Sequence, residues 1–246
     1  MKKYISVLLT LLMAMSLVAC TGNSKKADLV MATNAEFPPY EFRDSDNNIV
    51  GIDVEICQAI ADELGRNLVI EDMAFDSIIT SVYTGKADLG AAGMTITEDR
   101  LQSIDFSIPY ATAAQVIIVP NDSEIASPDD LVGKKIGVQL GTTGDIYAED
   151  IEDAEIERYN KGYEAVQALV QGKIDAVIID NEPAKVYVEK NPELKIVDEA
   201  FTYEEYAIAI SKNNPELLAE VNAAITKLKE SGKLDEIVNK YISADN

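Results

Sequence analysis

Residues 85–100 read GKADLGAAGMTITEDR. The pattern predicts a short buried strand over 87–92 that ends at Gly93, then a bend, then a helix capped by Thr97 with acidic residues in its first turn. Gly93 permits close approach to the backbone, and Arg100 can reach back over the bend with planar donors that match a carboxylate. This stretch therefore indicates a site for a small carboxylic acid. The alternative is an Arg100 that pairs with an acidic neighbour on the wet surface.

An internal similarity divides the chain into two halves of one design. Residues 79–90, ITSVYTGKADLG, resemble residues 166–177, VQALVQGKIDAV. Each stretch predicts an amphipathic helix ended by glycine, then a turn, then a buried strand. The two copies lie too far apart for a solenoid repeat, so we expect two α/β lobes.

The remaining hydrophobic pattern fits such lobes. A turn at 46–48 predicts a small hairpin that returns through 49–52. Strands are predicted at 29–33, 68–70, 116–119, 135–140, 155–158, 174–179 and 206–210, and helices at 54–65, 78–82, from 128 and, as a closing pair, within 215–241.

Residues 92–100, AGMTITEDR, together with Asp105-Phe106-Ser107, resemble a family signature. The pattern A-G-x-T-I-T-x-x-R followed by D-F-S is similar to that of bacterial extracellular solute-binding proteins of family 3, which bind polar amino acids for ABC importers. The resemblance extends from Leu29 to Tyr241. It implies an α/β, two-lobed periplasmic-binding-protein-like fold of type II, in which each lobe is a mixed sheet flanked by helices and two strands form a hinge.

The resemblance also implies the boundaries of these parts. Lobe 1 is expected to comprise 28–110 and 207–246, the hinge 111–115 and 202–206, and lobe 2 residues 116–201. The implied partners are a free L-amino acid and the permease of an ABC importer, and we expect a monomer.

The N-terminus has the pattern of a secreted lipoprotein. Met1-Lys2-Lys3 and the apolar run 4–19 predict a signal peptide that is too short to span a membrane comfortably. Residues 17–20, LVAC, resemble a lipobox, in which Cys20 is lipidated and becomes the new N-terminus, and 20–27 would form a tether. The alternative is an ordinary signal with a chance cysteine. We expect an extracytoplasmic protein, at the cell surface or in the periplasm, anchored to the bacterial membrane by this lipid alone.

Composition excludes several functions. The sequence contains no histidine, which excludes Ser-His and Cys-His nucleophile systems and histidine metal sites, and we expect no metal and no cofactor. A net charge of −22 without a basic cluster argues against nucleic acid binding. If Cys20 carries lipid, Cys57 has no partner, and its helical neighbours predict a small buried hydrophobe.

Candidate ligand contacts lie in four loops that follow predicted strands, namely 34–40, 93–97, 141–144 and 180–182. Residues 141–144, GTTG, precede a predicted helix start and offer amides to an anion, although a plain turn is the alternative. Asp180 ends an apolar strand, where a carboxylate is costly to bury unless a cation meets it; the alternative is a helix cap. The resemblance implies that Arg100, Thr142 and Thr143 hold the α-carboxylate of the ligand. It implies that Asp180, the Gly93 carbonyl and the Thr95 hydroxyl hold the α-ammonium.

Other positions would contact the ligand side chain. Phe37 and Phe75 match aromatic positions that close over this side chain in relatives. The alternative for each is an ordinary residue of the hydrophobic core. Asn34 falls where some relatives carry aspartate. Gln115 and Tyr206 lie at the expected hinge, where the pocket is completed.

The side-chain specificity follows less directly. Glu36 and Asp53, expected near Asn34, favour a basic ligand such as arginine, lysine or ornithine. Glutamine and cystine are the alternatives within the family. A different class, cyclohexadienyl dehydratases, uses a similar scaffold and would need a general acid, for which Glu36 or Glu182 is the candidate.

Overall fold

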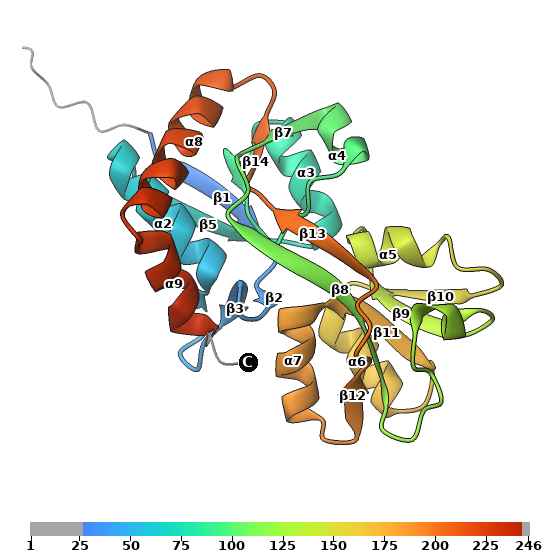
Figure 1. Cartoon of the computed structure of the whole chain (residues 1–246). Coiled ribbons are helices and arrows are strands. Elements are labelled where there is room, and N and C mark those ends of the chain that lie inside the picture. The colour runs from blue at the N-terminus through green and yellow to red at the C-terminus, as the bar shows by residue number, and fades with distance from the viewer. Residues whose placement is uncertain (1–26, 243–246) are drawn as a thin grey trace, which may run out of the picture.

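The structure is a computed structural model that describes residues 27–242, and it shows two lobes of strands and helices (Figure 1). Lobe 1 contains a five-stranded sheet in the order β5-β1-β6-β14-β7. Strands β5, β1 and β6 are parallel, whereas β14 runs antiparallel to both β6 and β7. The elements of this lobe are β1 (Leu29–Thr33), α2 (Ile52–Leu64), β5 (Leu68–Asp72), α3 (Phe75–Tyr83), β6 (Leu89–Gly90), α4 (Glu98–Ser103), β7 (Ile104–Phe106), β14 (Ala209–Ser211), α8 (Pro215–Glu230) and α9 (Lys233–Tyr241).

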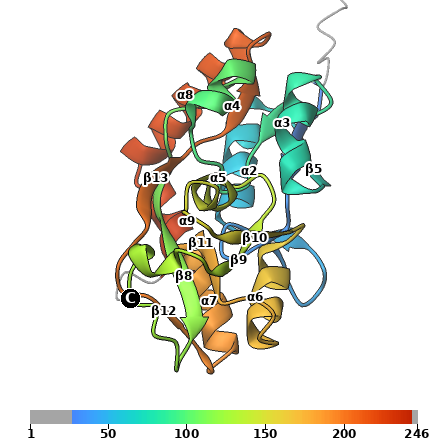
Figure 2. The same cartoon turned by 90° about the vertical axis from the view of Figure 1, so that its right-hand side faces the viewer.

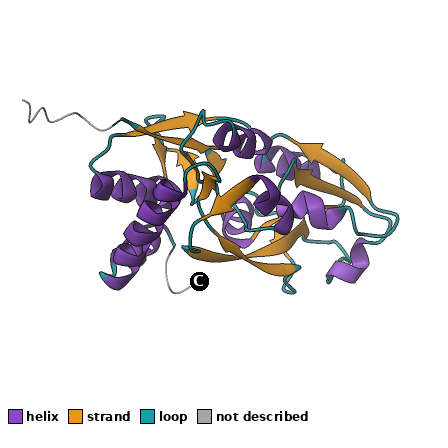
Figure 3. Cartoon of the chain, turned by 90° about the horizontal axis from the view of Figure 1, so that it is seen from above, coloured by secondary structure: helices purple, strands orange, loops and turns teal. Residues whose placement is uncertain are grey.

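Lobe 2 contains a second mixed sheet in the order β10-β9-β11-β8-β12. Strands β10, β9 and β11 are parallel, and β8 is antiparallel to β11 and β12. Figure 3 shows helices flanking the strands of both lobes. The elements are β8 (Ala111–Pro120), η1 (Pro128–Leu131), β9 (Lys135–Gln139), α5 (Thr143–Ala148), β10 (Glu155–Tyr159), α6 (Gly162–Val170), β11 (Ala176–Asp180), α7 (Asn181–Lys190) and β12 (Leu194–Ile196).

Two antiparallel strands connect the lobes. Strand β8 pairs with β13 (Thr202–Tyr206), with Thr202 opposite Gln115 and Tyr206 opposite Ala111. Figures 1 and 2 show this pair running from one lobe to the other. After β13 the chain enters lobe 1 as β14, and helices α8 and α9 then pack against α2. The two-lobed fold predicted from the sequence is therefore correct.

The internal similarity is visible in both lobes. Helix α3 leads into β6, and helix α6 leads into β11. Gly85 and Gly172 follow the two helices with φ of 73° and 66°, a left-handed conformation that suits glycine at a helix end. The repeated helix–glycine–strand unit was thus read correctly.

Local sequence explains the helix that carries Arg100. The Thr97 hydroxyl accepts a hydrogen bond from the Arg100 amide at 3.2 Å, so Thr97 caps α4 as predicted. In α2, Cys57 is buried, as expected for a small apolar residue.

Some strand bounds differ from the expectation. The strand predicted over 87–92 is shorter in the structure, where β6 comprises only Leu89–Gly90. The Ala91 amide still donates to the Ala32 carbonyl at 3.1 Å, and the chain then leaves the sheet. The strand predicted over 206–210 is two strands, since β13 ends at Tyr206 in the connection and β14 begins in the lobe 1 sheet.

A small sheet lies at the edge of lobe 1. The predicted hairpin is β3 (Glu41–Arg43) and β4 (Ile49–Val50), and β2 (Glu36–Phe37) pairs with β3 as a third strand. This addition matters because the first residue of β3, Glu41, is fully buried.

No helix in residues 27–242 is long and apolar enough to cross a bilayer. The predicted signal peptide and Cys20 lie outside the described residues.

Candidate functional site

A small cavity lies between the lobes. Lobe 1 lines it from the ends of β1 and β6, and lobe 2 lines it from the ends of β9 and β11, as expected where loops converge beyond the carboxyl ends of strands. The wall comprises Asn34, Phe37, Glu41, Phe75, Ala92, Gly93, Thr95, Arg100, Gln139, Thr142, Thr143 and Asp180. Nine of these were candidates from the sequence; Glu41, Ala92 and Gln139 were not.

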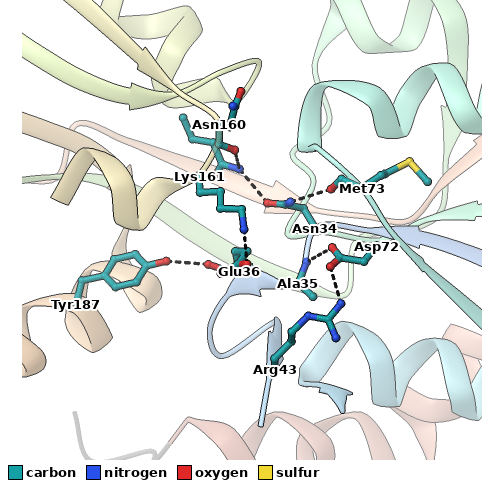
Figure 4. A network of polar contacts seen from close by, with 10 residues as sticks. Asn34, Ala35, Glu36, Arg43, Asp72, Met73, Asn160, Lys161 and Tyr187 are labelled. Atoms are coloured by element: carbon teal, nitrogen blue, oxygen red, sulfur yellow. Dashed lines mark hydrogen bonds and ion pairs between the residues drawn. The ribbon is translucent and has the colours of Figure 1, made fainter. Parts of the chain in front are cut away.

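The lobes touch each other beside this cavity (Figure 4). Lys161 of lobe 2 pairs with Glu36 of lobe 1 at 2.5 Å, and the Tyr187 hydroxyl donates to the Glu36 carbonyl at 2.8 Å. Nearby, the side-chain Nε2 of Gln139 donates to Asn34 Oδ1 at 3.0 Å. These contacts hold the lobes together at one edge of the cavity.

Arg100 lies in the cavity wall and is 6% exposed. Its Nη1 donates to the Thr95 carbonyl at 2.7 Å and its Nη2 to the Gly141 carbonyl of lobe 2 at 3.1 Å. The guanidinium lies over the Phe75 ring, 5.4 Å from its centroid. The surface ion pair considered as the alternative is therefore wrong. The guanidinium is buried and fixed, with Thr142 and Thr143 in the facing wall.

Gly93 is required where it lies. Its φ is 53°, and a Cβ there would lie 2.8 Å from the Phe37 ring and 3.3 Å from the Tyr206 ring. The Gly93 amide donates to Asp53 Oδ2 at 2.8 Å, which fixes the loop that leads to Thr95. Only glycine brings this backbone so close to the aromatic wall.

A first pair of buried acids lies at the connection between the lobes. Asp180 accepts a hydrogen bond from the Tyr206 hydroxyl, and burial, followed by the charge of Glu204, raises the pKa of Asp180 to about 7. Glu204 Oε2 accepts from Thr95 Oγ1 at 2.9 Å and from Gln115 Nε2 at 3.1 Å. Asp180 occupies the N-cap position of α7, but its side chain makes no capping hydrogen bond, so the helix-cap alternative is wrong for the carboxylate.

A second pair of buried acids consists of Glu41 and Asp53. Glu41 is 0% exposed and lines the cavity, and neither of its carboxyl oxygens has a hydrogen-bond partner within residues 27–242. Burial, followed by the charge of Asp53, raises the pKa of Glu41 well above its usual range. Asp53 Oδ2 accepts from the Gly93 amide at 2.8 Å and the Tyr110 hydroxyl at 2.7 Å. Glu41 is thus a buried acid with no cation against it among the described residues, and its nearest charged neighbour is another acid, Asp53.

Three candidates lie outside the cavity wall. The Glu36 carboxylate pairs with Lys161, so the sequence-based expectation that Glu36 faces a ligand side chain does not match its position. Gln115 is fully buried and donates to Thr143 Oγ1 at 3.2 Å, and Tyr206 contacts Asp180. Gln115 and Tyr206 thus support the wall from behind.

Sequence reasoning missed Glu41, Gln139 and Glu204. Two of them carried a usable signal. Gln139 lies next to the end of the strand predicted over 135–140, two positions before Gly141. Glu204 lies two positions from Tyr206 in a strand, hence on the same face. Glu41 follows the loop after Pro39 with no periodic signal. No cluster of acidic or cysteine side chains able to hold a metal occurs in the part of the chain that the structure describes.

Comparisons with known proteins agree with this geometry. The sequence pattern of the bacterial extracellular solute-binding proteins, family 3, matches residues 29–244. A probable histidine-binding protein of Neisseria gonorrhoeae is 34% identical over 262 aligned residues, covering 100% of this chain and 97% of that protein. The arginine-binding extracellular protein ArtP of Bacillus subtilis is 31% identical over 255 residues, covering 100% of both.

Solved structures agree as well. An ancestral arginine-binding protein bound to arginine superposes with a TM-score of 0.84 at 41% identity, covering 89% of this chain and 100% of that one. The sequence match and this fold similarity both extend over both lobes and the cavity between them. The chain therefore belongs to the bacterial extracellular solute-binding proteins, family 3.

Proposed function

We propose that this protein is the extracytoplasmic substrate-binding component of an amino-acid ABC importer and that its ligand is a basic L-amino acid, arginine before lysine or ornithine. The observation that carries the basic assignment is Glu41, a fully buried carboxyl in the cavity wall with both oxygens unpartnered among the described residues. A buried carboxylate is stable only when a cation or several donors meet it.

The main-chain groups of the ligand would bind between the lobes. Arg100 supplies a charged planar donor group for the α-carboxylate, and Asp180 supplies a carboxylate for the α-ammonium. Arg100 belongs to lobe 1 and Asp180 to lobe 2. A ligand that bridges them favours the closed arrangement by its differential contacts, and an importer can recognise closed lobes.

The side chain of the ligand would extend towards Glu41. Two unpartnered oxygens match the two parallel N–H groups of a guanidinium, which is why we place arginine first. The relatives named for histidine and arginine support a basic ligand. Glutamine and cystine remain the alternatives, because a protonated Glu41 can donate a hydrogen bond to a neutral side chain.

A thermal-shift screen of the twenty amino acids and cystine, followed by calorimetry, tests this assignment. Arginine should give the largest shift, and Glu41→Gln should weaken arginine binding about a hundredfold, since a buried charged contact contributes roughly 2–3 kcal/mol. Glutamine binding should change little. Glu36→Gln is the matched control, because Glu36 already pairs with Lys161. A wild-type protein stabilised by glutamine or cystine and not by arginine would contradict the basic assignment.

The enzyme alternative has little support in the cavity. Of its two candidate acids, Glu36 pairs with Lys161, and Glu182 pairs with Lys185 at 2.9 Å and accepts from Asn181 at 2.9 Å. Neither lines the cavity. Incubation with prephenate or arogenate should leave both compounds unchanged, and a product would overturn the assignment.

We further propose that Cys20 carries the lipid that anchors a monomeric protein outside the cytoplasm. Cys20→Ser should release a folded, ligand-competent protein from the membrane fraction, because acyl chains and not the domain would hold it there. A variant that stays with membranes after a carbonate wash would contradict the anchor.

A further inference from the structure

The acidic pair at Glu41 extends beyond the cavity wall. Glu41 and Asp53 are 0% and 1% exposed, yet only Glu41 lines the cavity. The charges that act most strongly on Glu41 are those of Asp53, Asp180 and Asp72, and none of these groups can carry a positive charge. Two carboxylates in one dry site repel each other and cannot both ionise cheaply.

Polar neighbours of the pair assign the single charge to Asp53. Asp53 Oδ2 accepts hydrogen bonds from the Gly93 amide and the Tyr110 hydroxyl, whereas Oδ1 has no partner in residues 27–242. These donors favour the anion, and burial still raises the pKa of Asp53 to about 6. Glu41 has no such donors, and burial, followed by the charge of Asp53, raises its pKa well above its usual range.

Other titratable groups face the pair without supplying a positive charge. Burial and the nearby acids raise the pKa of Tyr40, Tyr110, Cys57 and Tyr187. These groups are therefore neutral near pH 7, and none can balance a second carboxylate.

We propose that Glu41 and Asp53 hold one proton between them until a ligand cation arrives, and that the cation expels this proton to solvent. This inference rests on the proposed function. The O–H bond of Glu41 breaks, the proton passes to water or buffer, and the ligand guanidinium takes its place. The net charge of the site is conserved, because the singly protonated pair and the doubly ionised pair with one cation both carry one negative charge.

Asp53 is then a positioning residue that does not touch the ligand. Its carboxylate keeps the proton on Glu41, and it also holds the amide of Gly93. A neutral side chain leaves the proton in place, so discrimination between cationic and neutral ligands should weaken as the pH falls.

Asp180 is a second source of protons that the experiment must separate. Its pKa of about 7 means that any α-ammonium binding there releases protons near neutral pH. Arginine and citrulline have the same α groups and nearly the same shape, but only arginine carries a side-chain cation. The difference in proton release between them isolates the Glu41–Asp53 pair.

Calorimetry on the mature protein, in buffers of different ionisation enthalpy, counts the released protons. At pH 7 arginine should release close to one proton more than citrulline, and the excess should fall towards zero at alkaline pH. Glu41→Gln should abolish the excess. Asp53→Asn, which keeps an acceptor for Gly93 and Tyr110, should move the pH at which the excess is half-maximal to a lower value.

The possible failures are distinct. Tight arginine binding with no excess proton at any pH, or an excess that survives Glu41→Gln, overturns this inference and leaves the proposed ligand standing. Arginine that binds no tighter than citrulline overturns the proposed function, and this inference with it. Thermal melts of each variant identify a folding defect, and an excess that is unchanged in a folded Asp53→Asn variant overturns the role of Asp53.

Discussion

Two pairs of buried acids lie near one cavity, and the protein treats them differently. Asp180 and Glu204 accept hydrogen bonds from Tyr206, Thr95 and Gln115, and the Arg100 guanidinium interacts with both. The other pair has donors on Asp53 only, and the oxygens of Glu41 have none in the described chain. Each acid of the first pair has at least one donor, whereas in the second pair the acid that lines the cavity has none.

The largest expected effect is on stability at different pH values. The pKa of Asp180 is raised from 3.8 to about 7, so the folded state keeps a proton that the unfolded state has lost. Stability present below pH 4 is therefore lost as the pH rises towards 7, by up to about 4 kcal/mol. Asp180→Asn should be more stable than wild type at pH 8 and equal to it near pH 4, measured by denaturant unfolding. Asp53→Asn should differ less from wild type, because the pKa of Asp53 is raised only to about 6. If the stability of wild type and both variants depended on pH in the same way, neither carboxyl would contribute as expected.

The second effect concerns the cation beside the first pair. Arg100→Lys keeps the charge but loses the planar fork, and should weaken binding of every amino acid by about a hundredfold, or roughly 2–3 kcal/mol. Arginine and citrulline should lose equally, because both share the α-carboxylate. Calorimetry that shows unchanged affinity in a folded variant would remove Arg100 from the site.

A smaller effect should follow from Glu204→Gln. The glutamine carbonyl can still accept from Thr95 or Gln115, but the charge that raises the pKa of Asp180 is gone. Affinity at pH 7 should change by less than about tenfold, or roughly 1 kcal/mol. The pH below which all amino acids lose affinity should fall. An unchanged pH midpoint would show that Glu204 does not act on Asp180.

The smallest effect is expected for the contact between the lobes outside the cavity. The side chains of Glu36 and Lys161 are 29% and 35% exposed, and partly exposed ion pairs contribute about 0–1 kcal/mol. Lys161→Met should lower the affinities for arginine and for glutamine by the same small factor, below about fivefold. A selective gain in arginine affinity would instead place Glu36 in the side-chain pocket, because loss of the lysine would free its carboxylate for the ligand cation.

The fold was predictable because its signals are local and repeated. Periodic apolar residues and the glycine after each repeated helix indicated two α/β lobes, and Thr97 marked the start of α4. The site was predictable where it follows strand ends, as at Gly93 and Asp180. Glu41 was missed because its role depends on burial by distant elements, which no short pattern encodes. Glu36 was misjudged because its partner, Lys161, is far away in the sequence and belongs to the other lobe.

The contacts of Glu36 with Lys161 and Tyr187 join the lobes without involving the cavity. Whatever free energy they contribute to closure is the same for every ligand, so it cancels from the ratio of any two affinities. Substitutions there can change how many molecules are closed, by about tenfold for each 1.4 kcal/mol, and leave the ranking of ligands untouched. Strength of binding and choice of ligand are thus set at separate places, and selection can adjust one without disturbing the other.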